Sequence, residues 1–311
     1  MSNVHQVAVS GFGEGTNDIY DQYRPTYPVQ ALDQIHKLIS LSSPPSGPGQ
    51  GRGWKIIEPG SGTGILSRLL ICPPKPKPKP NALGYPSFNI STLVGVEPSK
   101  GMRDAFRRGF ESVSTSDPSS LQGRTVGAVQ GGFDDFVNVK EFGISKEEGV
   151  DAVIIAQAWH WCPDHEKALR EIASYLPPSH PLILIWNLES YTPSWQAAIR
   201  EAYQPYDLGT PQYYKGLWRD MFETVAYKEL FEDKEEWKTE WSVGITEDQL
   251  INRLFSKSYL TPAHLTGEGR TKLESELRKI ISGADHEWLN KEKGIFKYAY
   301  ETDIVVLRRK A

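Results

Sequence analysis

The chain has 311 residues, of which 39% are hydrophobic and 24% are charged, and its net charge is -4. This length and apolar content suffice for one large packed domain, which excludes a wholly disordered protein. Charges of both signs are mixed along the chain, so we expect no nucleic-acid partner and no membrane partner. The two cysteines, Cys72 and Cys162, exclude a disulfide framework and favour a reducing, cytoplasmic environment. Residues 1–10 lack the apolar run of a signal peptide, and no stretch reaches the roughly 20 apolar residues of a membrane span.

Short apolar segments alternate with amphipathic segments through the first two thirds of the chain. The apolar runs predict strands at 54–58, 91–97, 125–130, 150–157 and 181–187. The spacing of apolar residues predicts helices at 28–40, 65–71, 99–110 and 164–175. This alternation favours an α/β, Rossmann-like doubly wound sheet covered by helices on both faces. One segment, Pro73–Pro80, alternates lysine with proline and is expected to be an extended surface loop.

The character of the chain changes after residue 187. Residues 188–290 contain five of the nine tryptophans, and we expect a lid or substrate region with helices at 192–204 and 246–255 and a strand near 237–243. The tail at 296–309 is expected to be the last strand, returning to the sheet. We therefore expect seven strands, mostly parallel with the last one antiparallel. The chain then divides into a cofactor-covering segment (1–50), a sheet core (51–187), a helical lid insertion (188–290) and a C-terminal strand (291–311).

A glycine-rich turn between the first strand and its helix is the most informative motif. It runs Glu58-Pro59-Gly60-Ser61-Gly62-Thr63-Gly64, and its glycines allow a ligand to approach the backbone closely. The third small residue of a dinucleotide fingerprint would fall at Ile65, which does not fit. The carboxylate of Glu58 would repel a pyrophosphate but suits a ligand that carries an ammonium group and a sulfonium. The turn therefore favours a cationic nucleoside over a phosphorylated one.

A second acidic residue, Glu97, ends the second predicted strand. A carboxylate at this place accepts hydrogen bonds from the two hydroxyls of a ribose. The distance along the chain from the glycine turn exceeds the usual roughly 20 residues, and the proline-lysine segment accounts for the excess. Together, Glu58 and Glu97 indicate a binding site at one edge of the sheet.

The chain resembles the class I S-adenosylmethionine (SAM)-dependent methyltransferases, in particular a microbial and fungal small-molecule group that includes the trans-aconitate methyltransferases. The resemblance covers about residues 20–190. It is carried by Tyr20-Asp21-Gln22-Tyr23-Arg24-Pro25-Thr26-Tyr27-Pro28, Glu58 to Gly64, Val96-Glu97-Pro98-Ser99 with Met102, Gln157-Ala158-Trp159-His160-Trp161 and Ile185-Trp186-Asn187. It implies SAM as the cofactor.

The resemblance also implies which residues hold SAM. The turn residues Glu58, Gly60, Ser61, Gly62, Thr63 and Gly64 would line its methionine end. Glu97 would hold the ribose, with Pro98 and Met102 packed nearby. Gly132, Phe133 and Asp134 would contact adenine, with Asp135 as the alternative acceptor for the adenine amino group. Gln157 would pass under the sulfonium, and Tyr20 and Arg24 would cover the cofactor, Arg24 pairing with its carboxylate.

His160 follows the fourth predicted strand, at the sheet edge that faces the ligand. A histidine there has a pKa near neutrality and is a candidate general base, although it would serve equally well to orient its loop. The neighbouring Trp159 and Trp161 are candidates for walls of the methyl-donor pocket, with core packing as the alternative.

The predicted lid carries an aromatic cluster with one cation. Its members Trp195, Tyr213, Tyr214, Trp218 and Arg219 are candidates for holding a planar or anionic acceptor, and packing of helices onto the sheet is the alternative. The remaining histidines show no metal-ligand spacing, so we expect no metal site.

The sequence thus predicts an enzyme, a SAM-dependent methyltransferase that acts on an oxygen or sulfur of a small-molecule acceptor, such as a carboxylate, hydroxyl or thiol. Secondary metabolism is the expected setting. The alternatives are a SAM-binding protein without methyl transfer, such as a cyclase or a regulatory binder, and an N- or C-methyltransferase. We expect a monomer or a weak dimer.

Overall fold

The computed structural model describes residue 21 and residues 23–44, 52–74 and 84–311. Tyr20 and most of the proline-lysine segment lie outside the described residues. Within them, no helix is both long and apolar enough to cross a membrane.

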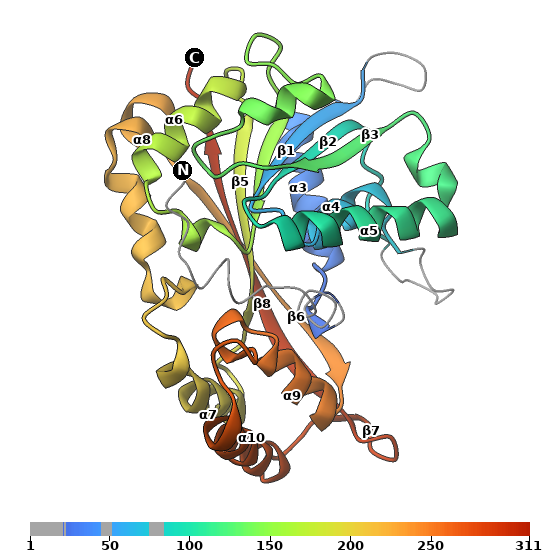
Figure 1. Cartoon of the computed structure of the whole chain (residues 1–311), viewed down its shortest axis with the longest axis vertical. Coiled ribbons are helices and arrows are strands. Elements are labelled where there is room, and N and C mark those ends of the chain that lie inside the picture. The colour runs from blue at the N-terminus through green and yellow to red at the C-terminus, as the bar shows by residue number, and fades with distance from the viewer. Residues whose placement is uncertain (1–20, 22, 45–51, 75–83) are drawn as a thin grey trace.

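One sheet runs through the whole molecule (Figure 1). Its strands follow the order β3-β2-β1-β4-β5-β8-β6, and a short β7 pairs with β8 outside this path. The pairs among β1 to β5 are parallel, whereas β8 is antiparallel to β5, β6 and β7. The predicted Rossmann-like sheet of seven strands is confirmed, with β7 as an eighth. The strands are β1 (Trp54–Pro59), β2 (Ile90–Val96), β3 (Thr125–Val129), β4 (Ala152–Ala156), β5 (Pro181–Glu189), β6 (Glu235–Ile245), β7 (Trp288–Asn290) and β8 (Ile295–Arg308).

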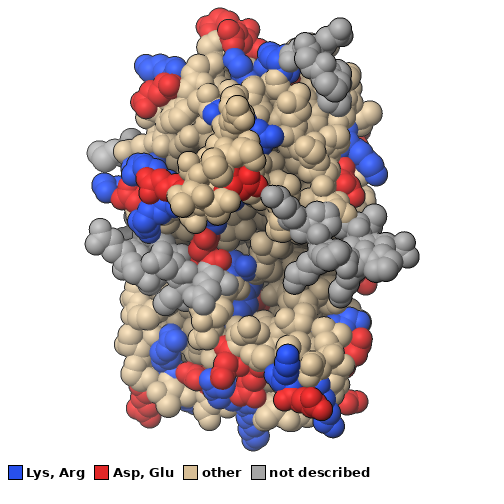
Figure 2. Space-filling model, turned by 90° about the vertical axis from the view of Figure 1, so that its right-hand side faces the viewer, with Lys and Arg blue, Asp and Glu red and all other residues tan. Residues whose placement is uncertain are grey.

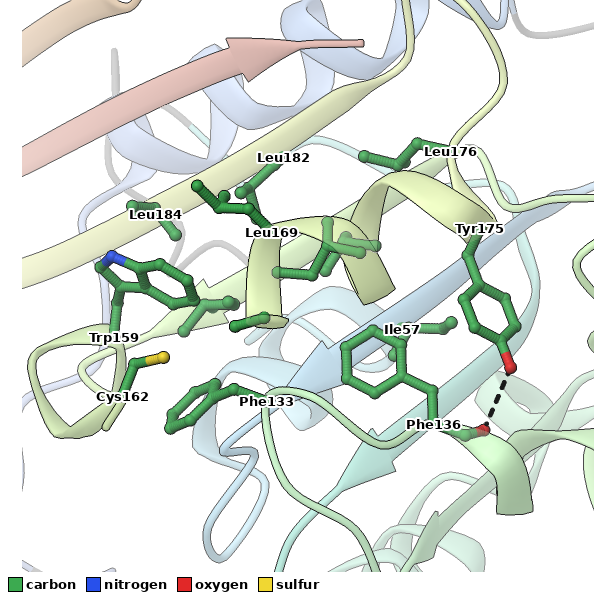
Figure 3. Packing of buried hydrophobic residues seen from close by; sticks show 14 of the residues in the cluster. Ile57, Phe133, Phe136, Trp159, Cys162, Leu169, Tyr175, Leu176, Leu182 and Leu184 are labelled. Carbon is green, nitrogen blue, oxygen red and sulfur yellow. Dashed lines mark hydrogen bonds between the residues drawn. The ribbon is translucent and has the colours of Figure 1, made fainter. Parts of the chain in front are cut away.

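Helices cover both faces of the parallel part of the sheet because its strands are apolar on both sides. On one face, α3 (Val29–Ser42), α4 (Ile65–Ile71) and α5 (Lys100–Ser116) pack on residues such as Ile56 and Ile154. On the other face, α6 (His165–Tyr175) and α8 (Val225–Leu230) pack on their sequence neighbours Ile57 and Ile155. Figure 3 shows this second layer, in which Leu169 of α6 lies beside Leu182 and Leu184 of β5.

A second lobe forms around the other half of the long strands β6 and β8. Its helices are α7 (Ser194–Tyr203), α9 (Glu247–Phe255) and α10 (Gly267–Ser282), and they share a separate hydrophobic core with residues such as Tyr298 of β8 (Figure 1). Thr246 and Gln249 form a capping box that starts α9. Short 3-10 helices complete the described chain at Pro118–Leu121, Val137–Phe142, Trp159–Trp161, Gln204–Tyr206, Tyr213–Lys215, Leu217–Glu223 and Ser258–Leu260.

Candidate functional site

The sheet reverses its strand order between β1 and β4. In an open α/β sheet, ligands bind at such a switch point, outside the carboxyl ends of the strands. A cavity of about 130 Å³ opens there. It is lined by Arg24, Pro25, Tyr27, Glu58, Gly60, Ser61, Gly62, Thr63, Ile65, Leu66, Glu97, Pro98, Met102, Phe133, Ala156, Gln157, Ala158, Trp161 and Arg253. We call it the cofactor cavity.

Glu58 and Glu97 are the two buried carboxylates of the cofactor cavity. Glu58 ends β1, accepts a short hydrogen bond from the hydroxyl of Ser67 and is held by burial at a pKa of about 8. Glu97 accepts the backbone N–H groups of Gly62 at 3.0 Å and Ser99 at 2.9 Å, and burial raises its pKa as well. Arg68 lowers the pKa of Glu58 and Arg103 lowers that of Glu97, but burial outweighs both effects. A cationic ligand would therefore stabilise the charged forms of these carboxyl groups.

Two glycines of the turn have positive φ for different reasons. Gly60 has φ 68°, and a Cβ there would lie 2.5 Å from the Cβ of Ala158, so a larger residue cannot fit. Gly62 has φ 55°, and a Cβ there would meet nothing within 4 Å. Since Gly62 also lines the cofactor cavity, the space that its missing side chain leaves is open to a ligand.

The segment before α3 spans the cofactor cavity. Asp21 accepts a hydrogen bond from Oγ1 of Thr63 at 2.8 Å and pairs with Arg68 of α4. Arg24 lines the cavity and donates from Nη2 to the carbonyl of Ser256, at the end of α9, over 3.1 Å. This segment thus joins the glycine turn to the second lobe across the cavity.

Three of the predicted cofactor residues do not line the cavity. Gly64 is the N-cap of α4, with φ 81°, and a Cβ there would meet the ring of Phe106 at 2.6 Å. Of the loop after β3, Phe133 lines the cavity, whereas Gly132 and Asp134 do not. Their predicted contacts with adenine stay predictions.

A second cavity of about 120 Å³ adjoins the first and shares Arg24, Gln157, Trp161 and Arg253 with it. Its other lining residues are His160, Asn187, Leu188, Glu189, Arg200, Tyr203, Gln212, Tyr213, Tyr214, Lys257, Ser258 and Tyr259. We call it the acceptor cavity. Figure 2 shows a hollow between the two lobes, with acidic and basic side chains inside it. Gln157 lies at the junction with φ 57°, a strained conformation that its side chain stabilises by donating to the carbonyl of Asn187 over 3.0 Å.

Among the residues that the structure describes, Glu189 is the only acidic one that lines the acceptor cavity, and three basic side chains surround it. Its carboxylate accepts the hydroxyl of Tyr203 at 2.6 Å and Nζ of Lys257 at 3.0 Å, and it lies 3.3 Å from Nη2 of Arg253. Arg200 donates a short hydrogen bond to its backbone carbonyl. Burial lowers the pKa of Lys257 to about 7, and the charge of Glu189 opposes this effect.

His160 lines the acceptor cavity, but its hydrogen bonding and its pKa differ from those of a histidine in water. Its Nδ1 accepts the indole N–H of Trp186 at 3.2 Å, so the neutral ring carries its proton on Nε2. Burial lowers its pKa to about 3, which keeps the ring neutral. This geometry favours a hydrogen-bond donor over the general base that the sequence suggested, and the base role stays a prediction.

The two neighbouring tryptophans have different environments. Trp161 lines both cavities. Trp159 is fully buried, lies edge-on to Phe133 and stacks on His165, so it lines neither cavity (Figure 3). Its burial under the loop corrects the expectation that both tryptophans wall the methyl-donor pocket.

Of the predicted aromatic cluster, Tyr213 and Tyr214 line the acceptor cavity, whereas the other three members do not. Trp195 packs on Tyr298 in the second lobe, and Trp218 is buried against Trp186. Arg219 lies over the ring of Trp218 and pairs with Glu236 away from the cavity. Trp195 and Trp218 pack between elements, which was the alternative interpretation of the cluster, and Arg219 is exposed.

Three basic residues of the acceptor cavity were not predicted from the sequence: Arg200, Arg253 and Lys257. A signal existed for Arg253, because it lies between Leu250 and Leu254 on the apolar face of α9. An arginine on such a face is rarely buried without an electrostatic reason. Across the described ranges, no group of three or more His, Cys, Asp or Glu residues could hold a metal ion.

Comparisons with known proteins agree with this site. No protein-family model matches the chain. It is 26% identical to an uncharacterized methyltransferase of Mycobacterium tuberculosis, over 89% of this chain and 87% of the relative. It is 24% identical to an uncharacterized methyltransferase-like protein of Schizosaccharomyces pombe, over 68% of this chain and 65% of that protein.

Among solved structures, a candidate type II methyltransferase of Anaeromyxobacter dehalogenans aligns with a TM-score of 0.51 at 15% identity, over 92% of this chain and 98% of that one. At this identity the likeness concerns the fold alone. The methyltransferase relatives, the sheet order and the acidic, glycine-lined cavity together lead to one conclusion: the chain is a SAM-dependent methyltransferase, with SAM as its cofactor.

Proposed function

We propose that the enzyme transfers the methyl group of SAM to an oxygen or sulfur of a small molecule that binds in the acceptor cavity. The observation that carries the proposal is the pair of adjoining cavities, which share Gln157, Trp161 and Arg253. A methyl group at the junction would face the cofactor on one side and the acceptor on the other. The reaction needs this alignment, because a methyl group passes from sulfur to its acceptor in line.

The charges of the cofactor cavity support the pose of SAM. Glu58 would lie near the ammonium and sulfonium, and Glu97 would accept the ribose hydroxyls. Both carboxyl groups are buried, so a positive ligand gains more from them than it would in water. Arg24 spans the cavity from the segment before α3 and would pair with the carboxylate of SAM.

The charges of the acceptor cavity favour oxygen or sulfur over nitrogen as the methylated atom. Four basic residues line it against the single acidic Glu189. A protonated amine would be repelled, whereas a carboxylate, a phenolate or a thiolate would be attracted. Such an ionised acceptor attacks the methyl carbon directly, the carbon–sulfur bond breaks with its electrons remaining on sulfur, and S-adenosylhomocysteine leaves.

The test combines cofactor binding with turnover. Calorimetry with the full chain should detect binding of S-adenosylhomocysteine and no binding of NAD or ATP. Incubation with methyl-labelled SAM and a fractionated metabolite extract should then yield a labelled small molecule whose methyl group is on oxygen or sulfur. A label on nitrogen or carbon, or binding of SAM without any transfer, would contradict the proposal and support the corresponding alternative.

A further inference from the structure

The acceptor cavity holds buried cations whose hydrogen-bonding capacity is only partly used. Arg253 is 4% exposed, and within the described part of the chain its Nε and Nη1 have no hydrogen-bond partner. Arg200 is 7% exposed, and its Nε has no partner there either. A buried guanidinium N–H without an acceptor costs free energy, so a site that persists in this form is suited to an acceptor atom from a ligand.

The balance of charge points in the same direction. Arg200, Arg253 and protonated Lys257 face one carboxylate, that of Glu189, and Glu189 is already bonded to Tyr203 and Lys257. Buried charges are stable when they are paired, so the unpaired positive charge calls for an anion. Arg253 lines both cavities, which places this anion near the transferred methyl group.

Aromatic rings make up much of the remaining wall. Tyr203, Tyr213 and Tyr214 each direct the hydroxyl to a protein carboxylate, those of Glu189, Asp303 and Asp207. What these residues offer a ligand is therefore the ring rather than a free hydroxyl. Tyr259 and Trp161 add two more rings to the wall. Aromatic rings at a binding site favour a planar, apolar partner.

The size of the acceptor cavity sets the scale of this partner. Its volume of about 120 Å³ is close to that of an apolar cavity of roughly 150 Å³ that admits one benzene ring. A single ring with a small substituent fits these dimensions.

We propose that the acceptor is a small monocyclic aromatic acid, whose carboxylate binds the guanidinium of Arg253 while its ring lies among the tyrosines. This inference rests on the proposed function and specifies its substrate class. Arg200 and Lys257 supply the surrounding positive charge. Arg253 can donate to the carboxylate from Nε or from Nη1, and a hydrogen bond between two charged groups is stronger than one between neutral groups.

The experiment measures binding of four probes by calorimetry, with the full chain saturated with S-adenosylhomocysteine. Benzoate tests the complete proposal, and benzamide keeps the ring without the charge. Tricarballylate keeps carboxylates without a ring, and inorganic phosphate is an anion alone. We expect benzoate to bind at least about tenfold more tightly than each of the other three, because only benzoate satisfies both the cation and the rings.

Two variants of Arg253 test the assigned contact. Arg253→Gln should lower the affinity for benzoate by at least about tenfold. Arg253→Lys keeps the charge but lacks the guanidinium, so its affinity for benzoate should lie between those of Arg253→Gln and the parent chain. Arg278→Gln is the matched control, since Arg278 also forms ion pairs in the second lobe but lines neither cavity. Melting temperatures and affinity for S-adenosylhomocysteine report whether each variant is folded.

The results test the substrate class and the role of Arg253 separately. Equal or tighter binding of tricarballylate, phosphate or benzamide would overturn the aromatic-acid class. An unchanged benzoate affinity in Arg253→Gln, or an equal loss of S-adenosylhomocysteine affinity, would overturn the assignment of Arg253 to the acceptor. Failure of benzoate alone leaves the methyltransferase proposal standing, whereas failure of S-adenosylhomocysteine to bind the parent chain would overturn both.

Discussion

The backbone N–H of Gly62 donates to Oε2 of Glu97 over 3.0 Å, so the glycine turn after β1 is tied to the end of β2. The same carboxylate accepts the N–H of Ser99 through its other oxygen. Glu97 therefore shapes the cofactor cavity as well as lining it. Its two oxygens are fixed in place before a ribose arrives, which is the preorganisation that makes a polar contact effective.

Replacement of Glu97 should strongly lower the affinity for the cofactor. In Glu97→Ala the N–H of Gly62 loses its partner and, in the proposed pose, the ribose hydroxyls lose their acceptor, so the affinity for S-adenosylhomocysteine should fall by at least about tenfold. Calorimetry measures this loss. Glu111→Ala, at an exposed position of α5, is the control and should bind normally. Normal affinity in Glu97→Ala would show that the ribose lies elsewhere.

Cofactor binding should strengthen with rising pH because of Glu58. Burial holds its pKa at about 8 in the free protein, Ser67 and Arg68 lower it and Glu97 raises it further. A cationic ligand favours the ionised carboxylate, so below that pKa binding must first remove a proton. The affinity for SAM should therefore increase from about pH 6.5 to about pH 8.5 and then level off.

Proton release provides a direct check of that prediction. Calorimetric titrations in buffers of different ionisation enthalpy should detect a proton that leaves on binding near neutral pH. Glu58→Gln, which cannot ionise, should bind more weakly and show a flat pH profile. A pH dependence that persists in Glu58→Gln would assign the proton to another group.

Replacement of Gly62 should lower the affinity for the cofactor. Its effect on stability should be limited to the strain of placing a side chain at a positive φ. Gly62→Ala places a methyl group into the open side of the cofactor cavity, so it should exclude the ligand. Gly143 is a matched control, because it has φ 70° with nothing within 4 Å of its missing Cβ, and it lines neither cavity. Both variants should lose about 1 kcal/mol of stability.

Affinity for S-adenosylhomocysteine separates the two glycine variants. Gly62→Ala should bind at least about tenfold more weakly, and Gly143→Ala should bind as the parent does. Equal affinities, at equal melting temperatures, would mean that the ligand does not occupy the space beside Gly62.

Benzoate affinity should decrease as the pH rises through the titration of Lys257. Burial places the pKa of this lysine at about 7, Arg253 and Arg24 lower it, and Glu189 raises it. The ring of Tyr203 lies 4.6 Å from its Nζ. Below pH 7 the lysine is positive and attracts the anion, and above it this attraction is lost. The dissociation constant should therefore rise several-fold between about pH 6 and about pH 8.5.

Lys257→Arg provides the comparison for this pH effect. An arginine stays charged across the range, so the variant should bind benzoate with a flat profile. Benzoate itself stays ionised, so its own charge does not contribute. A parent profile without slope, or a slope that survives in Lys257→Arg, would show that Lys257 does not set the affinity.

Local patterns predicted the parts of the fold that depend on neighbours in sequence. The strand at 54–58, the glycine turn and the helix at 65–71 appear as β1, the turn and α4, because burial on both faces and the positive φ of Gly60 leave those residues few alternatives. The helix α10 escaped prediction, since its buried side is a narrow stripe of Leu273, Leu277 and Ile281 among polar residues. Burial of so few residues depends on how the neighbouring helices pack against α10, which its local sequence does not indicate.

More residues of the cofactor cavity than of the acceptor cavity could be predicted, because the cofactor residues follow locally recognisable elements. Glu58 and Glu97 follow strands that the chain itself marks, whereas Arg200 and Glu189 meet Arg253 and Lys257 only because α7, α9 and β5 converge. Nothing in the local spacing of those residues indicates that they meet. The same holds for Trp159, whose burial depends on how its loop packs over α6.

The continuity of β8 constrains how this enzyme can move. Residues 300–308 pair with β5 in the first lobe, and residues 296–306 pair with β6 as both strands pass into the second. Swinging the lobes apart would break the backbone hydrogen bonds of that ladder, so the protein has no hinge there. The short stretch 23–27 borders the cofactor cavity and is held by hydrogen bonds from Arg24 to Ser256 and from Asn187 to Thr26. We therefore expect displacement of this stretch, rather than rotation of the lobes, to widen the way in for SAM.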